Sequence, residues 1–243
     1  MNSKNVFTAI IVLLFLKGYA QEIDKQENYF KNEVGLEVSD LLNGAMQLKY
    51  ERLIGKHLSV GLGIGLKGKN GIIRLSGLNT DQVKTSDITY SGFKIIPEVR
   101  YYINKTQQYA MDGFYFGAYL KYTNFKSDLD GTYINDADES FIIEFDAEIN
   151  ITSIGFMVGY KLPIGKRFSI DFLIAGPGAG FHKYSLINKR DLPDEFYTDL
   201  NEALEQYSLY DILDGDFRFS ATNEKADFVL PSFRYGISVG YSF

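Results

Sequence analysis

The chain has 243 residues, which is enough for one substantial domain and short for two. Its mean hydropathy of −0.13 excludes a helical membrane protein. The excess of 31 acidic over 25 basic residues argues against nucleic-acid binding, which needs a basic footprint, and the lack of cysteine excludes disulfides and cysteine-ligated metals. The combination of 23 Gly with 18 Tyr and 19 Phe is typical of barrels in lipid, which carry aromatic residues at the membrane interfaces.

The first twenty residues have the pattern of a secretory signal peptide. Lys4 supplies a positive charge, Val6 to Leu16 form an apolar run, and Gly18 and Ala20 are small residues placed for cleavage after Ala20. The run is shorter than the roughly 20 residues that a spanning helix needs. Removing residues 1–20 leaves 23 of the 25 basic residues against 31 acidic ones, so the mature chain has a net charge of −8.

The rest of the chain shows repeated two-residue alternation, which is the period of a β-strand. Between Phe233 and Phe243, bulky apolar residues alternate without a break with small or polar ones, and Leu58 to Leu66 alternate with Ser and Gly. A bulky face opposite a small, polar face predicts strands with lipid outside and a narrow lumen inside. This pattern predicts eight strands, at 33–41, 44–53, 57–67, 90–103, 112–125, 147–162, 166–178 and 231–243.

The links between these strands alternate in length. Short links follow the second, fourth and sixth strands, and long ones cover about 68–89, 126–146 and 182–230. Membrane barrels pair short periplasmic turns with long extracellular loops. We therefore expect residues 21–243 to form an all-β, eight-stranded antiparallel transmembrane β-barrel of the bacterial outer membrane, with both termini in the periplasm. The short link at Asn43-Gly44 is an exception, because the topology places it outside.

The last loop is too long to be a plain connection. Apolar residues recur at near-helical spacing after Pro193, which predicts a short amphipathic helix near 193–212 beside the barrel mouth. The helix is acidic, and its carboxylates have two interpretations, a solvated cap or a surface for a ligand or cation. They are Asp191, Asp194, Glu195, Asp199, Glu202 and Glu205.

Three motifs carry a resemblance to a known family: Tyr50-Glu51-Arg52, Pro97 to Tyr102, and Gly176 to Gly180. Together with the terminal Phe243 they resemble the small outer-membrane barrels of unknown function common in Bacteroidetes, from about Asn32 onward. That family is similar in overall design to the eight-stranded OmpA and OmpX barrels, and the resemblance implies no activity. The C-terminus also resembles the signal read by the barrel assembly machinery, through Arg234, Gly236, Val239, Tyr241 and Phe243.

Strand parity places ten charged residues on the inward face, and they are Glu37, Lys49, Glu51, Lys94, Glu98, Arg100, Lys121, Lys161, Asp171 and Arg234. The interior of an eight-stranded barrel is just wide enough for side chains to fill. Charges of both signs should therefore pair, since an unpaired buried charge is costly. The prediction is a closed lumen, and the alternative is a narrow polar pore or proton path.

Few residues are of the types that catalysis needs. Lipid-modifying enzymes of outer membranes need a nucleophile and a base, and His57 and His182 are the two histidines of the chain. His182 lies near Tyr184 and Ser185 at the predicted outer rim, so it is the candidate for that less favoured alternative. Acidic residues at 128–130 and 135–139 are interpreted as a solvated loop, with weak cation binding as the alternative.

The sequence therefore predicts a non-enzymatic outer-membrane protein whose extracellular loops interact with a partner or support the envelope. Its expected partners are outer-membrane lipid, lipopolysaccharide and, during insertion, the barrel assembly machinery. No cofactor, catalytic residue, metal ligand or nucleic acid is expected, and the extracellular ligand is not identified.

Overall fold

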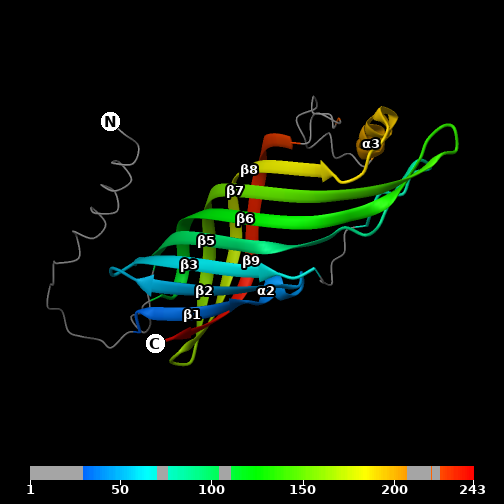
Figure 1. Cartoon of the computed structure of the whole chain (residues 1–243). Helices are drawn as coiled ribbons and strands as arrows, with labels where there is room; N and C mark the ends of the chain where they lie inside the picture. Colours follow the sequence, from blue (N-terminus) through cyan, green and yellow to red (C-terminus); the bar gives the residue numbers. More distant parts are fainter. Residues whose placement is uncertain (1–29, 70–75, 104–110, 207–219, 221–224) are drawn as a thin grey trace, which may run out of the picture.

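The computed structural model describes residues 30–69, 76–103, 111–206, 220 and 225–243. Within these ranges eight strands close into an antiparallel ring in the order β1-β2-β3-β5-β6-β7-β8-β9, and β1 pairs with β9 to complete it (Figure 1). The short strand β4 adds to the edge of β6. This ring confirms the predicted eight-stranded barrel. The predicted signal peptide, residues 1–20, lies outside the described residues.

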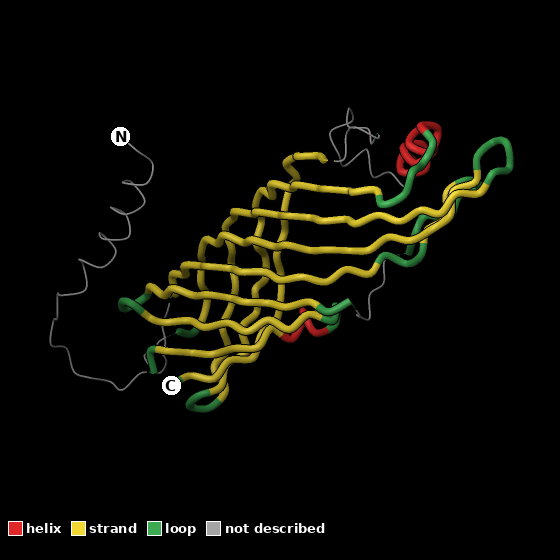
Figure 2. Tube along the Cα trace, viewed as in Figure 1, coloured by secondary structure: helices red, strands yellow, loops and turns green. Residues whose placement is uncertain are grey.

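The strands are longer on one side of the ring than on the other. The bounds are β1 Asn32–Glu37, β2 Ala45–Leu53, β3 Leu58–Lys67, β4 Val83–Thr85, β5 Thr89–Tyr102, β6 Gly113–Ile134, β7 Ser140–Ile164, β8 Phe168–Asn188 and β9 Lys225–Ser242. Figure 2 shows the long strands projecting beyond the short ones toward the helix α3, Asp194–Gln206. We call that the lobe end, and the opposite end, which holds the β2–β3 and β7–β8 links and the C-terminus, the turn end.

Among the described residues, two helices interrupt the strands. Residues 38–41, predicted as the end of the first strand, form the short helix α2, Val38–Leu41, and Gly44 closes the following turn at φ 69°. The second helix is α3, Asp194–Gln206, which confirms the predicted helix near 193–212 as far as residue 206. Neither helix, nor any other in the part of the chain that the structure describes, has the length and hydropathy needed to span a membrane.

The outward face of the ring is apolar along a band. On β6 the band runs from Phe114 to Tyr122, and both of these aromatic residues are exposed. That stretch matches the roughly 9–11 residues with which a tilted strand crosses a bilayer. The neighbouring strands continue the band through exposed residues such as Phe156 on β7, 75% exposed, and Tyr235 on β9, 75% exposed. Such a large exposed apolar surface is the kind that lipid covers.

Beyond this band the two faces exchange character. The predicted loop at 126–146 is wrong, because β6 continues to Ile134 and β7 begins at Ser140. The predicted loop at 182–230 also begins too early and ends too late, because β8 reaches Asn188 and β9 begins at Lys225. In the extension the inward side chains Tyr133, Ile143 and Phe145 are buried, whereas most outward ones are polar or charged, with Ile142, 68% exposed, as an exception. The apolar face therefore turns inward there, as in a soluble protein.

Candidate functional site

The interior at the turn end is filled by ion pairs around Lys161. Its ammonium group donates to Glu33 at 2.7 Å and to Glu51 at 2.6 Å, and it is fully buried. Glu51 also accepts hydrogen bonds from Ser59 at 2.5 Å and from the Tyr102 hydroxyl at 2.7 Å. These short bonds satisfy the carboxylate from several strands, which is what a buried charge requires.

A second centre lies around Arg100, which is 1% exposed. Its guanidinium contacts Asp171 at 2.8 Å, Glu98 at 2.6 Å and Glu51 at 3.3 Å. The Tyr115 hydroxyl donates to Asp171 at 2.7 Å, and the guanidinium lies over that tyrosine ring at 4.4 Å from its centroid. The two centres share Glu51, so together they form one network across the lumen.

Inward glycines provide the room for these long side chains. A Cβ on Gly240 would lie 2.5 Å from Glu33 Oε1, and a Cβ on Gly65 would lie 2.7 Å from Lys94 Cε. Contacts so short would force the side chains to move. The alternation of Gly with bulky residues therefore has a steric cause at these positions, because each of the two glycines faces a charged side chain.

The structure places all ten predicted inward charges on the inner face of the ring. Eight of them form ion pairs among the described residues, and they are Lys49, Glu51, Lys94, Glu98, Arg100, Lys161, Asp171 and Arg234. Glu37 instead accepts a hydrogen bond from Ser39 at 2.7 Å. Lys121 has no ion pair or hydrogen bond within the part of the chain that is described.

Sequence reasoning missed several members of the network. Glu33 is 7% exposed and holds Lys161, and it has the same strand parity as Glu37, so the alternation itself contained that signal. Tyr102 and Tyr115 share the inward parity of their strands in the same way. Asp40 pairs with Lys94 at 2.5 Å from helix α2, where strand parity carries no information.

The lobe end has a hydrophobic core of its own. We use the term lobe for β4, residues 129–145 of the β6–β7 hairpin, and α3. Phe196 of α3 is 1% exposed and stacks on Phe145 with ring centroids 5.8 Å apart. The Tyr133 and Phe196 rings pack edge to face, with centroids 5.2 Å apart. The other residues of this cluster are Val83, Ile143 and Leu200. The helix is therefore packed against the inner face of the hairpin and is not a loose cap.

One polar contact ties α3 to the hairpin. The Tyr133 hydroxyl donates to Asp199 at 2.6 Å. Burial, and then this hydrogen bond to a carboxylate, raise the pKa of Tyr133 above its ordinary value. The phenol therefore stays protonated as a donor, and Asp199, one of the predicted acidic helix residues, has a structural partner.

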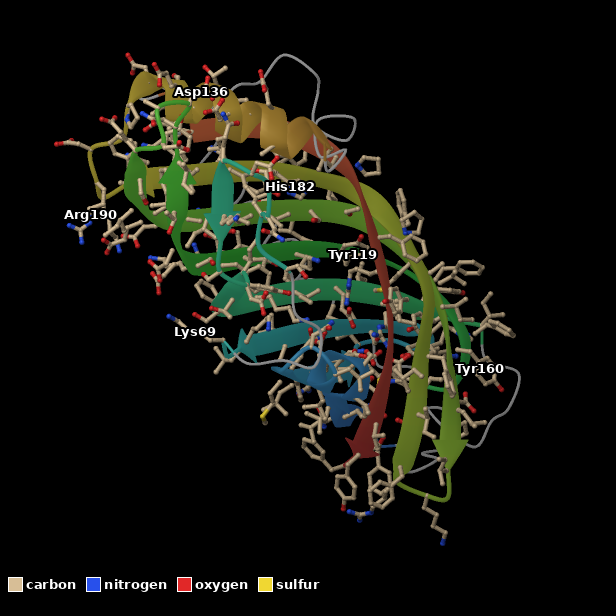
Figure 3. All side chains as sticks on the ribbon, turned by 90° about the vertical axis from the view of Figure 1, so that its right-hand side faces the viewer. Lys69, Tyr119, Asp136, Tyr160, His182 and Arg190 are labelled. Carbon is tan, nitrogen blue, oxygen red and sulfur yellow. The ribbon has the colours of Figure 1, made fainter. Side chains whose placement is uncertain are left out.

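The outer surface at the lobe end carries exposed ion pairs between neighbouring strands and loops. Lys189 pairs with Asp146 at 2.6 Å, and Arg190 pairs with Glu144 at 2.8 Å. Figure 3 shows Lys69, Asp136 and Arg190 toward one end of the molecule and Tyr160 toward the other. Within the described residues no group of three or more His, Asp or Glu side chains is placed to hold a metal ion.

The two histidines lie far apart in the barrel. His57 is at the turn end, where its Nδ1 is 2.9 Å from the Tyr102 carbonyl oxygen. His182 faces inward from β8 and stacks with Tyr184 and Phe228, with ring planes within 9° of parallel. Its Nδ1 lies 3.5 Å from the Tyr184 hydroxyl, and Ser185 points to the other face of the strand.

The residues predicted as the assembly signal lie on β9. Arg234 and Gly236 face inward, whereas Val239 and Tyr241 belong to the outward band. The Phe243 backbone amide donates to the Asn32 carbonyl oxygen at 2.9 Å, next to the β1–β9 seam that closes the ring.

Comparison with known proteins gives a family without an assigned role. The model of a family described as "Protein of unknown function (DUF3575)" matches residues 10–196. Among solved structures, one similar chain is CarO from Acinetobacter baumannii, with a TM-score of 0.40 and 13% identity over 90% of this chain and 100% of that one. No curated protein matches the chain.

Proposed function

The chain belongs to the DUF3575 family of proteins of unknown function, and we propose that it is a closed outer-membrane barrel that displays a folded lobe outside the cell. Both termini would then be periplasmic, and the lobe would bind a partner at the cell surface without catalysis. The closer resemblance to Bacteroidetes barrels of OmpA and OmpX design is part of this proposal.

One observation carries the proposal: the lobe has its own buried core beyond the apolar band. Phe196, Tyr133 and Phe145 bury their rings in a region that lipid does not cover. A barrel that only anchors or stiffens a membrane gains nothing from ordering a helix there, because ordering each residue costs about 1–2 kcal/mol of conformational entropy. A folded lobe instead presents a rigid, charged surface of the kind that recognises a partner.

The network at the turn end favours a closed barrel over a channel. Arg100 and Lys161 are buried, and their carboxylate partners come from several strands. An ion crossing the lumen would have to break contacts of 2.6–2.8 Å. The contacts of His182 likewise give no support to a lipid-modifying enzyme, since its neighbours are aromatic rings and a tyrosine hydroxyl.

Single cysteines test the orientation, because the natural chain has none. Ala137→Cys lies at the exposed tip of the β6–β7 hairpin, and Lys166→Cys lies in the exposed β7–β8 link at the turn end. A membrane-impermeant maleimide added to intact cells is expected to label the first variant and not the second. Labelling of Lys166→Cys alone would reverse the topology and reject the external lobe.

Planar-bilayer recording tests closure in the same preparation. The refolded protein is expected to give no discrete conductance steps. Reproducible steps that change when Arg100 or Lys161 is replaced would establish the channel alternative and reject the closed barrel.

A further inference from the structure

The inner wall changes character between the closed network and the lobe. At the level of Tyr119 the wall is sealed: this residue is 2% exposed, and its hydroxyl donates to the Gly176 carbonyl oxygen at 3.0 Å. One step toward the lobe, inward-facing residues such as Lys121 and His182 are partly exposed. Solvent therefore reaches the lumen from the lobe end and stops near Tyr119.

A group of polar side chains gathers just above this floor, and we call it the mouth cluster. It consists of Lys121, Thr123, Ser153, His182 and Arg234. Lys121 and Ser153 are direct cross-strand partners on β6 and β7, and Ser153 is in turn opposite Gly180 on β8. His182 Nε2 and Ser153 Oγ lie 2.8 Å and 3.3 Å from the place where a Cβ on Gly180 would sit. Both polar atoms therefore approach the same point on the inner wall, which only glycine leaves uncovered.

Several hydrogen-bond donors of the mouth cluster have no partner. Ser153 is 1% exposed and Thr123 is 2% exposed, yet neither hydroxyl makes a hydrogen bond in the described part of the chain. Arg234 Nη1 is also buried without one, and it lies 3.7 Å from Glu98. Buried polar groups in proteins are almost always hydrogen-bonded, so unpaired donors on adjacent strands indicate a missing acceptor.

The charge around the mouth cluster is positive. The charged groups that act on Lys121 are Arg234, Lys94 and Asp40, and Asp40 is already paired with Lys94. Glu98 is shared between Arg234 and the buried Arg100, which it contacts at 2.6 Å. In the turn-end network each cation has a close carboxylate, whereas Lys121 has none among the described residues. The missing acceptor should therefore be an anion.

We propose that the mouth cluster binds a phosphate-type oxyanion, entering from the lobe end. Lys121 supplies the charge, the Ser153 and Thr123 hydroxyls and His182 Nε2 supply hydrogen bonds, and the Tyr184–Phe228 stack walls one side. The phosphate is either free or carried on lipopolysaccharide, since both present the same oxygens. This site lies below the lobe and does not depend on the proposed display function.

The two histidines provide the experiment. The refolded barrel in detergent is titrated with inorganic phosphate while the imidazole resonances are followed by NMR, with chloride at equal ionic strength as the blank. We expect the His182 signals to shift saturably and those of His57, at the turn end, to stay in place. In Lys121→Met the affinity should fall about tenfold or more, because a charge-assisted hydrogen bond is lost.

A matched control and a second ligand make the outcomes distinguishable. Lys126→Met removes an exposed lysine from the outer face of the same strand and should leave the titration unchanged. Ser153→Ala keeps the strand pairing and should weaken phosphate binding. This second variant tests the site if Lys121→Met does not fold. A shift seen only with deacylated lipopolysaccharide assigns the phosphate to that source. No saturable shift with either ligand, or equal shifts at both histidines, overturns the proposal.

Discussion

The two ends of the barrel interior are filled by different kinds of side chain. At the turn end, Arg100 and Lys161 are buried among carboxylates from other strands, and the lumen is filled by charge pairs. At the lobe end, Phe196 and Tyr133 are buried among apolar side chains, and the inner face is covered by a helix. The first arrangement fills the lumen with paired charges, and the second holds a surface in place beyond the apolar band.

The difference follows from what surrounds each region. In the proposed membrane position, lipid around the turn end takes up the apolar side chains, so polar groups have to go inside and neutralise one another. Water around the lobe end takes up the charges, so apolar groups go inside. Removing one side chain of an interacting pair should therefore have different consequences in the two regions. At the turn end it leaves a buried charge without its partner, and at the lobe end it leaves an apolar cavity.

The largest effect is expected for Lys161→Met. This substitution keeps most of the length of the side chain but leaves Glu33 buried without its cation and Glu51 with only the longer ion pair to Arg100. Breaking a buried pair in this way costs about 3–5 kcal/mol in the free energy of unfolding. Guanidinium unfolding in detergent micelles, followed by the shift between folded and unfolded bands on unboiled gels, measures the loss.

Lys126→Met is the control for that loss. Its partner Glu148 lies 3.8 Å away, and the lysine is 68% exposed, so the cost should stay below about 1 kcal/mol. Adding Glu51→Gln to Lys161→Met should recover part of the stability, because it removes one of the stranded charges. Equal losses in Lys161→Met and Lys126→Met would show that the turn-end network is not stabilising.

The contrast between the two ends also explains what the sequence could predict. Inside the apolar band the outward face is the bulky one, so alternation alone located the eight strands and ten of the inward charges. Beyond the band the rule is reversed. Leu129, Ile143 and Phe145 face inward there, while Asp128 and Glu144 face outward. Because the bulky residues are no longer outside, the pattern of this stretch was interpreted as a loop.

Contacts made by irregular segments were beyond the same reasoning. Asp40 reaches Lys94 because residues 38–41 form a helix, and nothing in the two-residue pattern fixes where that side chain points. The packing of α3 on the hairpin depends on the strand extension, so it could not be predicted before the extension was known. The mouth cluster was only partly anticipated: Lys121 and Arg234 follow from parity, but the unpaired state of Ser153 and Thr123 does not.

An intermediate effect is expected for Phe196→Ala in the lobe. Truncating a buried Phe costs about 3–5 kcal/mol, but here the loss falls on the attachment of α3 and not on the strand ring, so the effect on the whole barrel is smaller than for Lys161→Met. Local opening of the helix should rise by about a hundredfold or more, which limited proteolysis with chymotrypsin detects as faster cleavage within residues 194–206. The gel shift on boiling, which reports the ring, should be unchanged.

Glu202→Ala tests whether that result reflects packing. Glu202 lies on the same helix but is exposed, so its removal should leave the cleavage rate near that of the natural chain. If Phe196→Ala and Glu202→Ala are cleaved equally slowly, the aromatic cluster does not hold α3, and the rigid lobe on which the proposed function rests is lost.

The smallest effect is expected at the outer surface of the lobe end, where Lys69 contacts Asp128 at 2.7 Å. The hydrogen bond from Lys69, and then its charge, lower the pKa of Asp128 below its ordinary value of 3.8. A carboxyl group whose pKa is depressed by folding stabilises the folded state above the unfolded pKa and loses that contribution as the pH falls through the folded value. The contact should therefore weaken only below about pH 4.

NMR titration of the Asp128 carboxyl carbon measures this directly. The titration midpoint should lie below 3.8 in the natural chain and rise toward 3.8 in Lys69→Met. Lys189 acts on Asp128 more weakly than Lys69 does, so Lys189→Met should raise the midpoint less. Overall stability should hardly change in either variant, because both side chains of the pair are more than half exposed and water screens their attraction. A midpoint that ignores Lys69 would mean that the exposed pair is not formed in solution. The charged outer surface would then be a set of independent side chains, unlike the coupled network inside the turn end.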